Sequence, residues 1–223
     1  MTSVSASRPR ILTIEGNIGA GKSTFLGELK KRYENRKDIL FLLEPVGIWE
    51  SVVDDHGKNM LEKFYENPQK YSFAFQVLAF STRLKMIREA VEKAMEPDSP
   101  ITTIIMERSL DADRAIFAQM LWDDGLLESC EFDIYKRIAQ DAMDMFHADG
   151  ILWLTVEPDL CYERVGTRGR EGENKITLDY LVKCDSYHKQ WLGADMGFVF
   201  QVEDSKNESP LFWKKVDLYV LRD

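Results

Sequence analysis

Short runs of apolar, β-prone residues recur along the chain and alternate with longer stretches that predict helices. The run at 102–106, Thr-Thr-Ile-Ile-Met, carries no charge at either set of alternate positions, which is typical of a strand buried on both faces. Such alternation predicts a five-stranded parallel sheet with helices on both faces, and therefore an α/β fold. The predicted strands are Ile11–Glu15, Ile39–Leu43, Ile101–Met106, Ile151–Val156 and Phe198–Val202.

The length of the chain, 223 residues, suits one such domain better than two. No internal repeat or low-complexity linker interrupts the alternation, so residues 10–223 are expected to form a single domain. Residues 1–9 precede the first predicted strand and are expected to be a disordered lead-in.

The composition of the chain argues against several kinds of binding partner. The formal net charge of −9 argues against non-specific binding to nucleic acid, which requires a positive field. The apolar runs are far shorter than a membrane span, and three cysteines and three histidines favour neither a disulfide framework nor a zinc site. The scattered cysteines fit a reducing compartment, where each is expected to be buried. The first nine residues resemble neither a secretory signal nor a convincing mitochondrial presequence, so the cytoplasm is the location expected by exclusion.

A glycine-rich segment after the first predicted strand, residues 16–23, matches the phosphate-binding pattern G-x-x-x-x-G-K-[ST]. A strand before it and a predicted helix after it are the context in which this pattern binds nucleotides. The backbone N–H groups and Lys22 would hold the phosphates, and the Ser23 hydroxyl would bind Mg²⁺. The alternative is a glycine-rich turn without a ligand. The predicted phosphate site comprises Gly16, Asn17, Ile18, Gly19, Ala20, Gly21, Lys22, Ser23 and Thr24.

Charged residues follow the next two predicted strands. Ligands of open α/β sheets bind beyond the carboxyl ends of the strands, so these residues are expected near the phosphate loop. Glu44 is the candidate general base for a substrate hydroxyl, with a helix-capping or salt-bridging acid as the alternative. Glu107 is placed to reach the metal ion and Arg108 to neutralise charge on the transferred group; a surface ion pair is the alternative.

A segment rich in arginine and glycine follows the fourth predicted strand. Arg164, Arg168 and Arg170 are predicted to form a lid that closes over phosphates, excludes water and stabilises developing charge. The alternative is a solvated charged loop.

The helix predicted from about residue 71 to 95 contains the candidate substrate contacts. Gln76, Phe80 and Arg83 are expected on one face, where an amide, an aromatic ring and a guanidinium would suit a nucleobase edge. The alternative is a core amide with local partners and a surface arginine.

Together these segments resemble the cellular deoxynucleoside kinases, which are the deoxycytidine, deoxyguanosine and deoxyadenosine kinases with the related insect and mitochondrial enzymes. The resemblance covers about residues 10–204 and rests on five motifs in the family's order. These are Ile14-Glu15-Gly16-Asn17-Ile18, Glu44-Pro45-Val46 with Trp49, Phe73-x-Phe75-Gln76 with Arg83, Glu107-Arg108-Ser109 with Asp113-Arg114, and Arg164-x-x-x-Arg168-x-Arg170.

The resemblance implies a P-loop kinase fold with an arginine-rich lid, and transfer of the ATP γ-phosphate to the 5′-hydroxyl of a deoxynucleoside in nucleotide salvage. It implies Mg²⁺ held by Ser23 and Glu107, with Glu44 and Arg108 at the 5′-hydroxyl. Arg164 and Arg168 would also pack near the donor adenine. The implied substrate contacts are Tyr65 and Glu173 at the 3′-hydroxyl, Gln76, Arg83 and Asp113 at the base, and Trp49, Phe80 and Phe117 on the pocket walls.

A few residues depart from the vertebrate members of the family. Asp111 and Ala112 replace expected hydroxyl-bearing residues, and Phe64 stands where a methionine is common. Gly172 is expected to loosen the lid. These changes put the preferred substrate in doubt and leave the reaction class intact.

The implied base pocket disfavours thymidine. Arg83 and Asp113 would form a charged pair where the 5-methyl group of thymine would have to lie, so dA, dG or dC is the expected substrate. Small residues at Ala79 and Ala112 favour a purine.

A homodimer is expected, because the helix from about residue 71 and the one predicted at 132–147 carry more apolar residues than one sheet face needs, and the family pairs through helices. The alternatives for function are a nucleoside monophosphate kinase, which would place arginines rather than Glu44 beside the acceptor oxygen, a thymidine-accepting kinase of broad specificity, and a nucleotide-binding switch protein without a substrate pocket.

Overall fold

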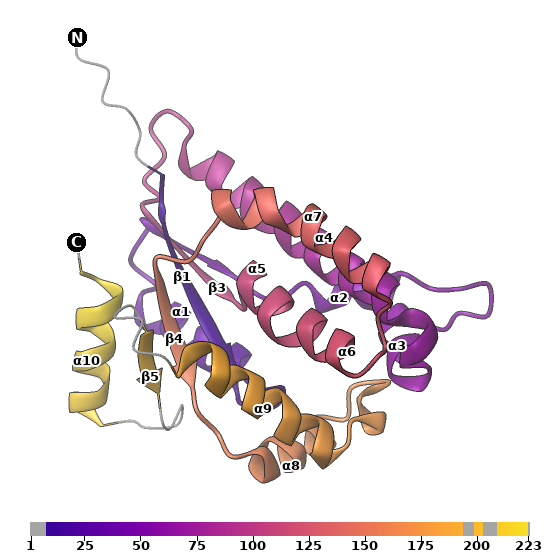
Figure 1. Cartoon of the computed structure of the whole chain (residues 1–223). Helices are drawn as coiled ribbons and strands as arrows, with labels where there is room; N and C mark the ends of the chain where they lie inside the picture. The colour runs from indigo at the N-terminus through magenta and orange to yellow at the C-terminus, as the bar shows by residue number, and fades with distance from the viewer. Residues whose placement is uncertain (1–7, 194–198, 203–208, 223) are drawn as a thin grey trace.

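The computed structural model describes residues 8–193, 199–202 and 209–222. Within these residues the centre of the molecule is a parallel sheet of five strands in the order β2-β3-β1-β4-β5, with helices on both faces (Figure 1). The strands are β1 (Arg10–Gly16), β2 (Ile39–Leu42), β3 (Thr103–Glu107), β4 (Gly150–Leu154) and β5 (Val199–Val202). The predicted α/β fold is confirmed, and the strand ends differ from prediction by one or two residues. Phe198, the predicted start of the last strand, lies outside the described residues.

The helices divide between the two faces of the sheet. Helices α4 and α7 lie side by side over one face, with the segment from α5 to α6, whereas α1, α8 and α10 pack on the other (Figure 1). The described helices are α1 (Lys22–Arg32), α2 (Val46–Ser51), α3 (Met60–Glu66), α4 (Pro68–Ala94), α5 (Leu110–Ala112), the π-helix η1 (Asp113–Ala118), α6 (Gln119–Asp123), α7 (Ser129–Met145), α8 (Pro158–Arg168), the 3₁₀-helix η2 (Glu173–Lys175), α9 (Leu178–Leu192) and α10 (Pro210–Val220).

The alternation of side chains along the central strands explains this arrangement. In β3, Ile104 is buried against the α4 and α7 side, and its neighbour Ile105 is buried against the α1 side. Each face must therefore be covered by helices, as in other parallel sheets. Helix α4 begins three residues earlier than predicted, because Asn67 caps it by accepting a hydrogen bond from the Lys70 N–H and Pro68 fits the first turn.

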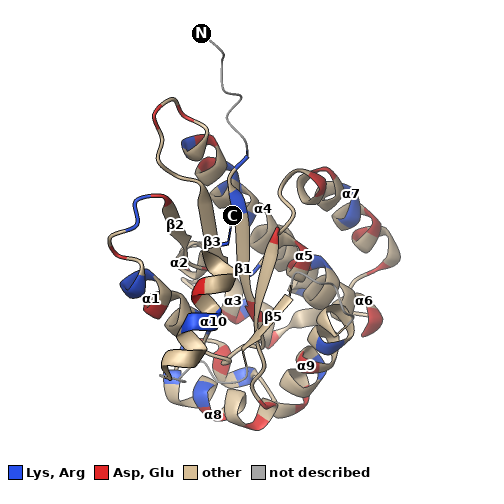
Figure 2. Ribbon diagram, turned by 90° about the vertical axis from the view of Figure 1, so that its left-hand side faces the viewer, with Lys and Arg blue, Asp and Glu red and all other residues tan. Residues whose placement is uncertain are grey.

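Positive and negative side chains are mixed over the surface, as the composition of the chain suggests (Figure 2). Lys and Arg alternate with Asp and Glu along the helices in Figure 2. None of the helices in the described ranges combines the length and apolarity that crossing a membrane requires. Cys161 and Cys184 are buried as expected, but Cys130 is exposed, because it lies in the first turn of α7 at the surface. Of the predicted lead-in, Arg8 is described and pairs with Asp149, whereas residues 1–7 lie outside the described residues.

Candidate active site

The phosphate loop joins β1 to α1 at the carboxyl edge of the sheet. Gly16 and Gly21 have φ angles of 143° and 94°, which favour glycine, and a Cβ on Gly16 would lie 2.7 Å from the carbonyl oxygen of Leu154. Asn17 holds the loop, since its Nδ2 donates to the Leu181 carbonyl at 2.8 Å and its Oδ1 accepts from the Ile18 N–H at 2.8 Å.

Lys22 folds over the inside of this loop. Its Nζ donates to the carbonyl oxygens of Gly16 and Asn17 at 3.1 and 2.8 Å. Burial, with the nearby charge of Arg108, lowers the pKa of Lys22 to about 8. The nearby carboxylates therefore do not fully offset the cost of burying this positive charge, at the site where phosphates are expected.

Ser23 and Glu107 offer a pair of oxygen ligands beside Lys22. The Ser23 Oγ donates to Glu107 Oε1 at 2.9 Å, and Glu107 is only 4% exposed. Within the described residues no group of three or more His, Cys, Asp and Glu side chains could hold a metal ion by itself. Two hard oxygen ligands nevertheless fit Mg²⁺, which usually keeps waters and completes its shell with substrate phosphate oxygens.

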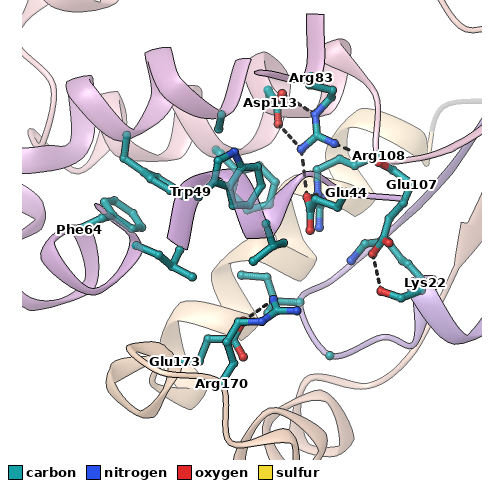
Figure 3. Close-up of a pocket in the computed structure, with 18 of the residues that line it drawn as sticks. Lys22, Glu44, Trp49, Phe64, Arg83, Glu107, Arg108, Asp113, Arg170 and Glu173 are labelled. Atoms are coloured by element: carbon teal, nitrogen blue, oxygen red, sulfur yellow. Dashed lines mark hydrogen bonds and ion pairs between the residues drawn. The ribbon is translucent and has the colours of Figure 1, made fainter. Parts of the chain in front are cut away.

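Glu44 follows β2 and faces the phosphate loop (Figure 3). Its Oε1 accepts hydrogen bonds from Arg83 Nη2 at 3.0 Å and Arg108 Nε at 3.2 Å. Its Oε2 accepts none from the part of the chain that the structure describes. Burial would raise the pKa of Glu44, but the charges of Arg108 and Arg83 outweigh burial and lower it to about 2. The carboxylate is thus ionised and keeps one oxygen for a ligand.

Arg83 connects three parts of the site and is only 1% exposed. Besides its bond to Glu44, its Nε donates to Asp113 Oδ2 at 2.8 Å and its Nη1 to the Glu107 carbonyl at 3.0 Å. Burial would lower the pKa of Arg83, but the carboxylates of Asp113 and Glu44 raise it, so the guanidinium is charged. The predicted pair with Asp113 is present, and the alternative of a surface arginine is wrong.

Arg108 is buried as well, so the alternative of a surface ion pair is also wrong. Its φ of 66° lies in the left-handed region, which is unusual for arginine and frequent at functional sites. Its Nη2 donates to the Gly16 carbonyl at 3.3 Å, and its guanidinium lies 4.6 Å from the Phe117 ring centre. Arg108 therefore links Glu44 to the phosphate loop.

These side chains surround a cavity of about 320 Å³, a size typical of small-molecule sites. Phe64 and Phe75 stack with ring centres 4.7 Å apart, and Trp49 packs edge-on against Phe75. Gln76 is 3% exposed, and its side-chain amide forms no hydrogen bond with the described residues. The predicted site residues that line the cavity are Ile18, Gly19, Lys22, Ser23, Glu44, Trp49, Tyr65, Gln76, Arg83, Glu107, Arg108, Asp113, Phe117, Arg168, Arg170 and Glu173.

Some predicted residues lie elsewhere. Phe80 does not line the cavity but packs edge-on against Tyr135 of α7, with ring centres 5.7 Å apart. At about 100° per residue, Phe80 lies about 100° from Ala79 and about 60° from Arg83, so it is at the edge of the stripe that lines the cavity, on the side that α7 covers. Arg164 does not line this cavity either, but its Nη1 donates to the Ala20 carbonyl of the phosphate loop at 3.3 Å. Ala112 is fully buried and does not line the cavity, so only Ala79 gives room for a second ring.

Sequence reasoning missed several residues of the cavity wall. Phe75 lies four residues before Ala79, so the helical spacing could have identified it. Leu61 comes from the short helix α3, and Tyr180 comes from α9. Phe64, named from the sequence as a change at the pocket wall, does line the cavity. No pattern in the chain signals Leu61 or Tyr180, because only the tertiary structure brings α3 and α9 to the cavity.

The lid is closed against the cavity by ion pairs. Glu173 holds Arg168 at 2.7 Å and Arg170 at 3.1 Å. Gly172 has a φ of 85°, and a Cβ there would lie 3.0 Å from the Cα of Glu62. The missing side chain therefore allows the lid to pack closely on α3, and the expectation that Gly172 loosens the lid stays a prediction.

Comparison with known proteins agrees with this geometry. The model of the deoxynucleoside kinase family matches residues 12–216. The chain is 35% identical over 194 residues to a probable deoxycytidine kinase of Fowlpox virus, covering 86% of this chain and 75% of that protein. It is 34% identical over 203 residues to deoxycytidine kinase of Homo sapiens, covering 83% and 76%. It is 30% identical over 196 residues to mitochondrial deoxyguanosine kinase of Xenopus laevis, covering 81% and 72%.

Proposed function

The chain belongs to the deoxynucleoside kinase family, and we propose that it transfers the γ-phosphate of ATP to the 5′-hydroxyl of dA, dG or dC in preference to thymidine. Kinase activity on deoxynucleosides with ATP follows from the family. The base preference and the roles of individual residues are the proposal. The observation that supports it best is the Oε2 of Glu44, which accepts no hydrogen bond from the described residues on a side chain that lines the same cavity as Lys22 and Ser23.

In this proposal the 5′-hydroxyl of the nucleoside donates its hydrogen bond to Glu44 Oε2. The 5′-oxygen attacks the γ-phosphorus, the bond to the oxygen that bridges the β- and γ-phosphates breaks, and ADP leaves. The hydroxyl proton passes to Glu44 as the new bond forms. A pKa of about 2 makes Glu44 a weak base before ligands bind, so orientation of the hydroxyl is its main contribution.

Cations around the transferred group stabilise its charge. Lys22 and the loop amides bind the donor phosphates, Arg108 approaches from β3, and Arg168 and Arg170 approach from the lid. Ser23 and Glu107 would hold Mg²⁺, which supplies further neutralisation of phosphate charge when bound.

The nucleoside occupies the cavity with its base between aromatic walls. Trp49 and Phe64 flank the base, and the free amide of Gln76 reads its edge. The pair of Arg83 and Asp113 excludes the 5-methyl group of thymine and keeps polar atoms for an amino-bearing base. The 3′-hydroxyl binds at Tyr65 and Glu173, which line the same cavity.

Two chains are proposed to pair through α4 and α7. Ile134 and Ile138 are 47% and 45% exposed on α7, and Met145 near its end is 61% exposed. A second copy would cover these apolar side chains. A cytoplasmic location remains a prediction; the cysteines Cys130, Cys161 and Cys184, which form no disulfide, are compatible with any reducing compartment.

The test is ATP consumption with a panel of acceptors. Initial rates are measured with dA, dG, dC and thymidine, and with the corresponding 5′-monophosphates. Nucleosides are expected to be phosphorylated and monophosphates are not. Thymidine used as efficiently as the best nucleoside would refute the base preference, and activity confined to monophosphates would refute the proposed acceptor.

A further inference from the structure

Glu173, the residue proposed to bind the 3′-hydroxyl of the sugar, also forms hydrogen bonds with two arginines of the lid. Its carboxylate is 4% exposed and lies across the cavity from Arg83 and Asp113 (Figure 3). It accepts from Arg168 Nε at 3.0 Å, from Arg168 Nη2 at 2.7 Å to each oxygen, and from Arg170 Nη1 at 3.1 Å. One buried carboxylate therefore holds both arginines at the tip of the lid.

The two guanidinium groups keep N–H groups for another ligand. In the described part of the chain, Arg168 Nη1 and Arg170 Nη2 donate no hydrogen bond. Both arginines line the same cavity as Lys22 and Ser23. The contacts with Glu173 thus hold the arginines at the cavity without using up their capacity to bind phosphate oxygens.

The segment that carries Glu173 is fixed from the nucleoside side of the cavity. Gly172 packs against the backbone of Glu62 in α3, the helix that also supplies Tyr65. Arg170 Nε lies 3.8 Å from Glu50 in α2, next to Trp49. The position of the lid arginines consequently depends on the helices that form the nucleoside pocket.

We propose that Glu173 is a positioning residue for the lid, which holds Arg168 and Arg170 toward the donor phosphates while it receives the 3′-hydroxyl of the nucleoside. The inference rests on the proposed function for that hydroxyl. Both roles fit one carboxylate, which has about four acceptor sites. Arg168 Nη2 contacts both oxygens, so a hydroxyl can replace one of these contacts while Arg168 Nε and Arg170 Nη1 stay bound.

The test compares two variants of the protein, each with two nucleoside substrates. Glu173→Gln keeps the shape of the side chain but removes its charge and replaces one acceptor oxygen with an NH₂ group, which cannot accept from a guanidinium. Glu171→Gln removes the same charge from an exposed position of the same lid segment. Each is assayed with the best 2′-deoxynucleoside and with its 2′,3′-dideoxy analogue, which lacks the 3′-hydroxyl. Because both variants lose one negative charge, long-range effects on ATP cancel between them.

The expected result is that kcat with the dideoxy analogue is at least about tenfold lower for Glu173→Gln than for Glu171→Gln, since loss of one charge-stabilising donor typically costs about 10²–10³-fold. Equal kcat values with the dideoxy analogue would show that Glu173 serves the hydroxyl alone and would overturn the inference. A higher kcat for Glu173→Gln would overturn it too. Absence of nucleoside phosphorylation by the wild-type protein would instead refute the proposed function.

A second variant serves if Glu173→Gln fails to fold, as judged by thermal melting. Gly172→Ala changes none of the charged side chains, but it puts a Cβ 3.0 Å from Glu62 Cα at a φ of 85° that strains alanine, so the lid segment must shift away from α3. Its kcat with both substrates is expected to fall about tenfold relative to Gly169→Ala, which also has a positive φ of 63° but where a Cβ meets no atom within 4 Å. Equal kcat values for these two variants would overturn the inference.

Discussion

Replacement of Arg83 by methionine would remove a charge that three parts of the active site share. The side chain is 1% exposed and donates to Asp113, Glu44 and the Glu107 carbonyl. Glu44 would keep Arg108 as a partner and is 17% exposed. Asp113 is 4% exposed, and Arg83 is the partner with which it forms an ion pair. The main consequence is therefore a buried, uncompensated carboxylate at Asp113.

The expected loss of stability depends on how many partners the remaining charge keeps. Removal of one partner from a buried ion pair costs about 3–5 kcal/mol in the free energy of unfolding. Asp113→Ala should cost less, because Arg83 keeps Glu44 and the Glu107 carbonyl. The double variant, Arg83→Met with Asp113→Ala, has no unpaired buried carboxylate. Its decrease in the free energy of unfolding should therefore be smaller than the sum of the two single decreases by about 2 kcal/mol.

The measurement is a double-mutant cycle from denaturant unfolding, with Arg88→Met as the control. Arg88 lies on the same helix, is 58% exposed and pairs with Glu92 at 3.9 Å, so its replacement should cost less than about 0.5 kcal/mol. Additive losses at Arg83 and Asp113, or a cost at Arg83 close to that at Arg88, would refute the reasoning. The double variant should also accept thymidine, which rate measurements with thymidine and dC would check.

Three further predictions concern the reaction, the donor site and the assembly. Glu44→Gln should lower kcat by about 10²–10⁴-fold with little change in ATP binding, and near-normal turnover would exclude Glu44 as the base. The pKa of Lys22 is lowered to about 8, so the ammonium is lost as pH rises through this value, and ATP affinity should fall about fivefold from pH 8 to pH 9. That decrease should vanish in Lys22→Arg, whose guanidinium does not titrate there; if it persists, another group is responsible. Light scattering at micromolar concentration should give twice the chain mass of 25.8 kDa, because Ile134 and Ile138 need a partner; a monomer would contradict the dimer.

The sequence determined the sheet and the phosphate loop. The uncharged run at 102–106 can only be stable where both faces are covered, so it predicted the central strand β3 without knowledge of its partners. The glycines at 16 and 21 permit backbone angles that other residues avoid, so the loop conformation is encoded locally. The order of the motifs identified the family, which the match over residues 12–216 confirmed.

Helical spacing alone did not identify which residues of α4 line the pocket. It grouped Gln76, Phe80 and Arg83, but it could not decide which side of α4 faces a ligand and which faces α7. Both sides are apolar and buried, so their residue types are alike, and only the packing of α7 assigns Phe80 to the core.

Only the tertiary structure brought together residues distant in the chain. Arg83 reaches Glu44 across 39 positions, and Asn17 reaches Leu181 across 164. The sequence shows only that Gly172 lacks a side chain, whereas the structure shows that α3 packs where that side chain would lie. Local sequence limits the conformations of a segment, whereas the charge, burial and freedom of a side chain depend on which other segments fold against it.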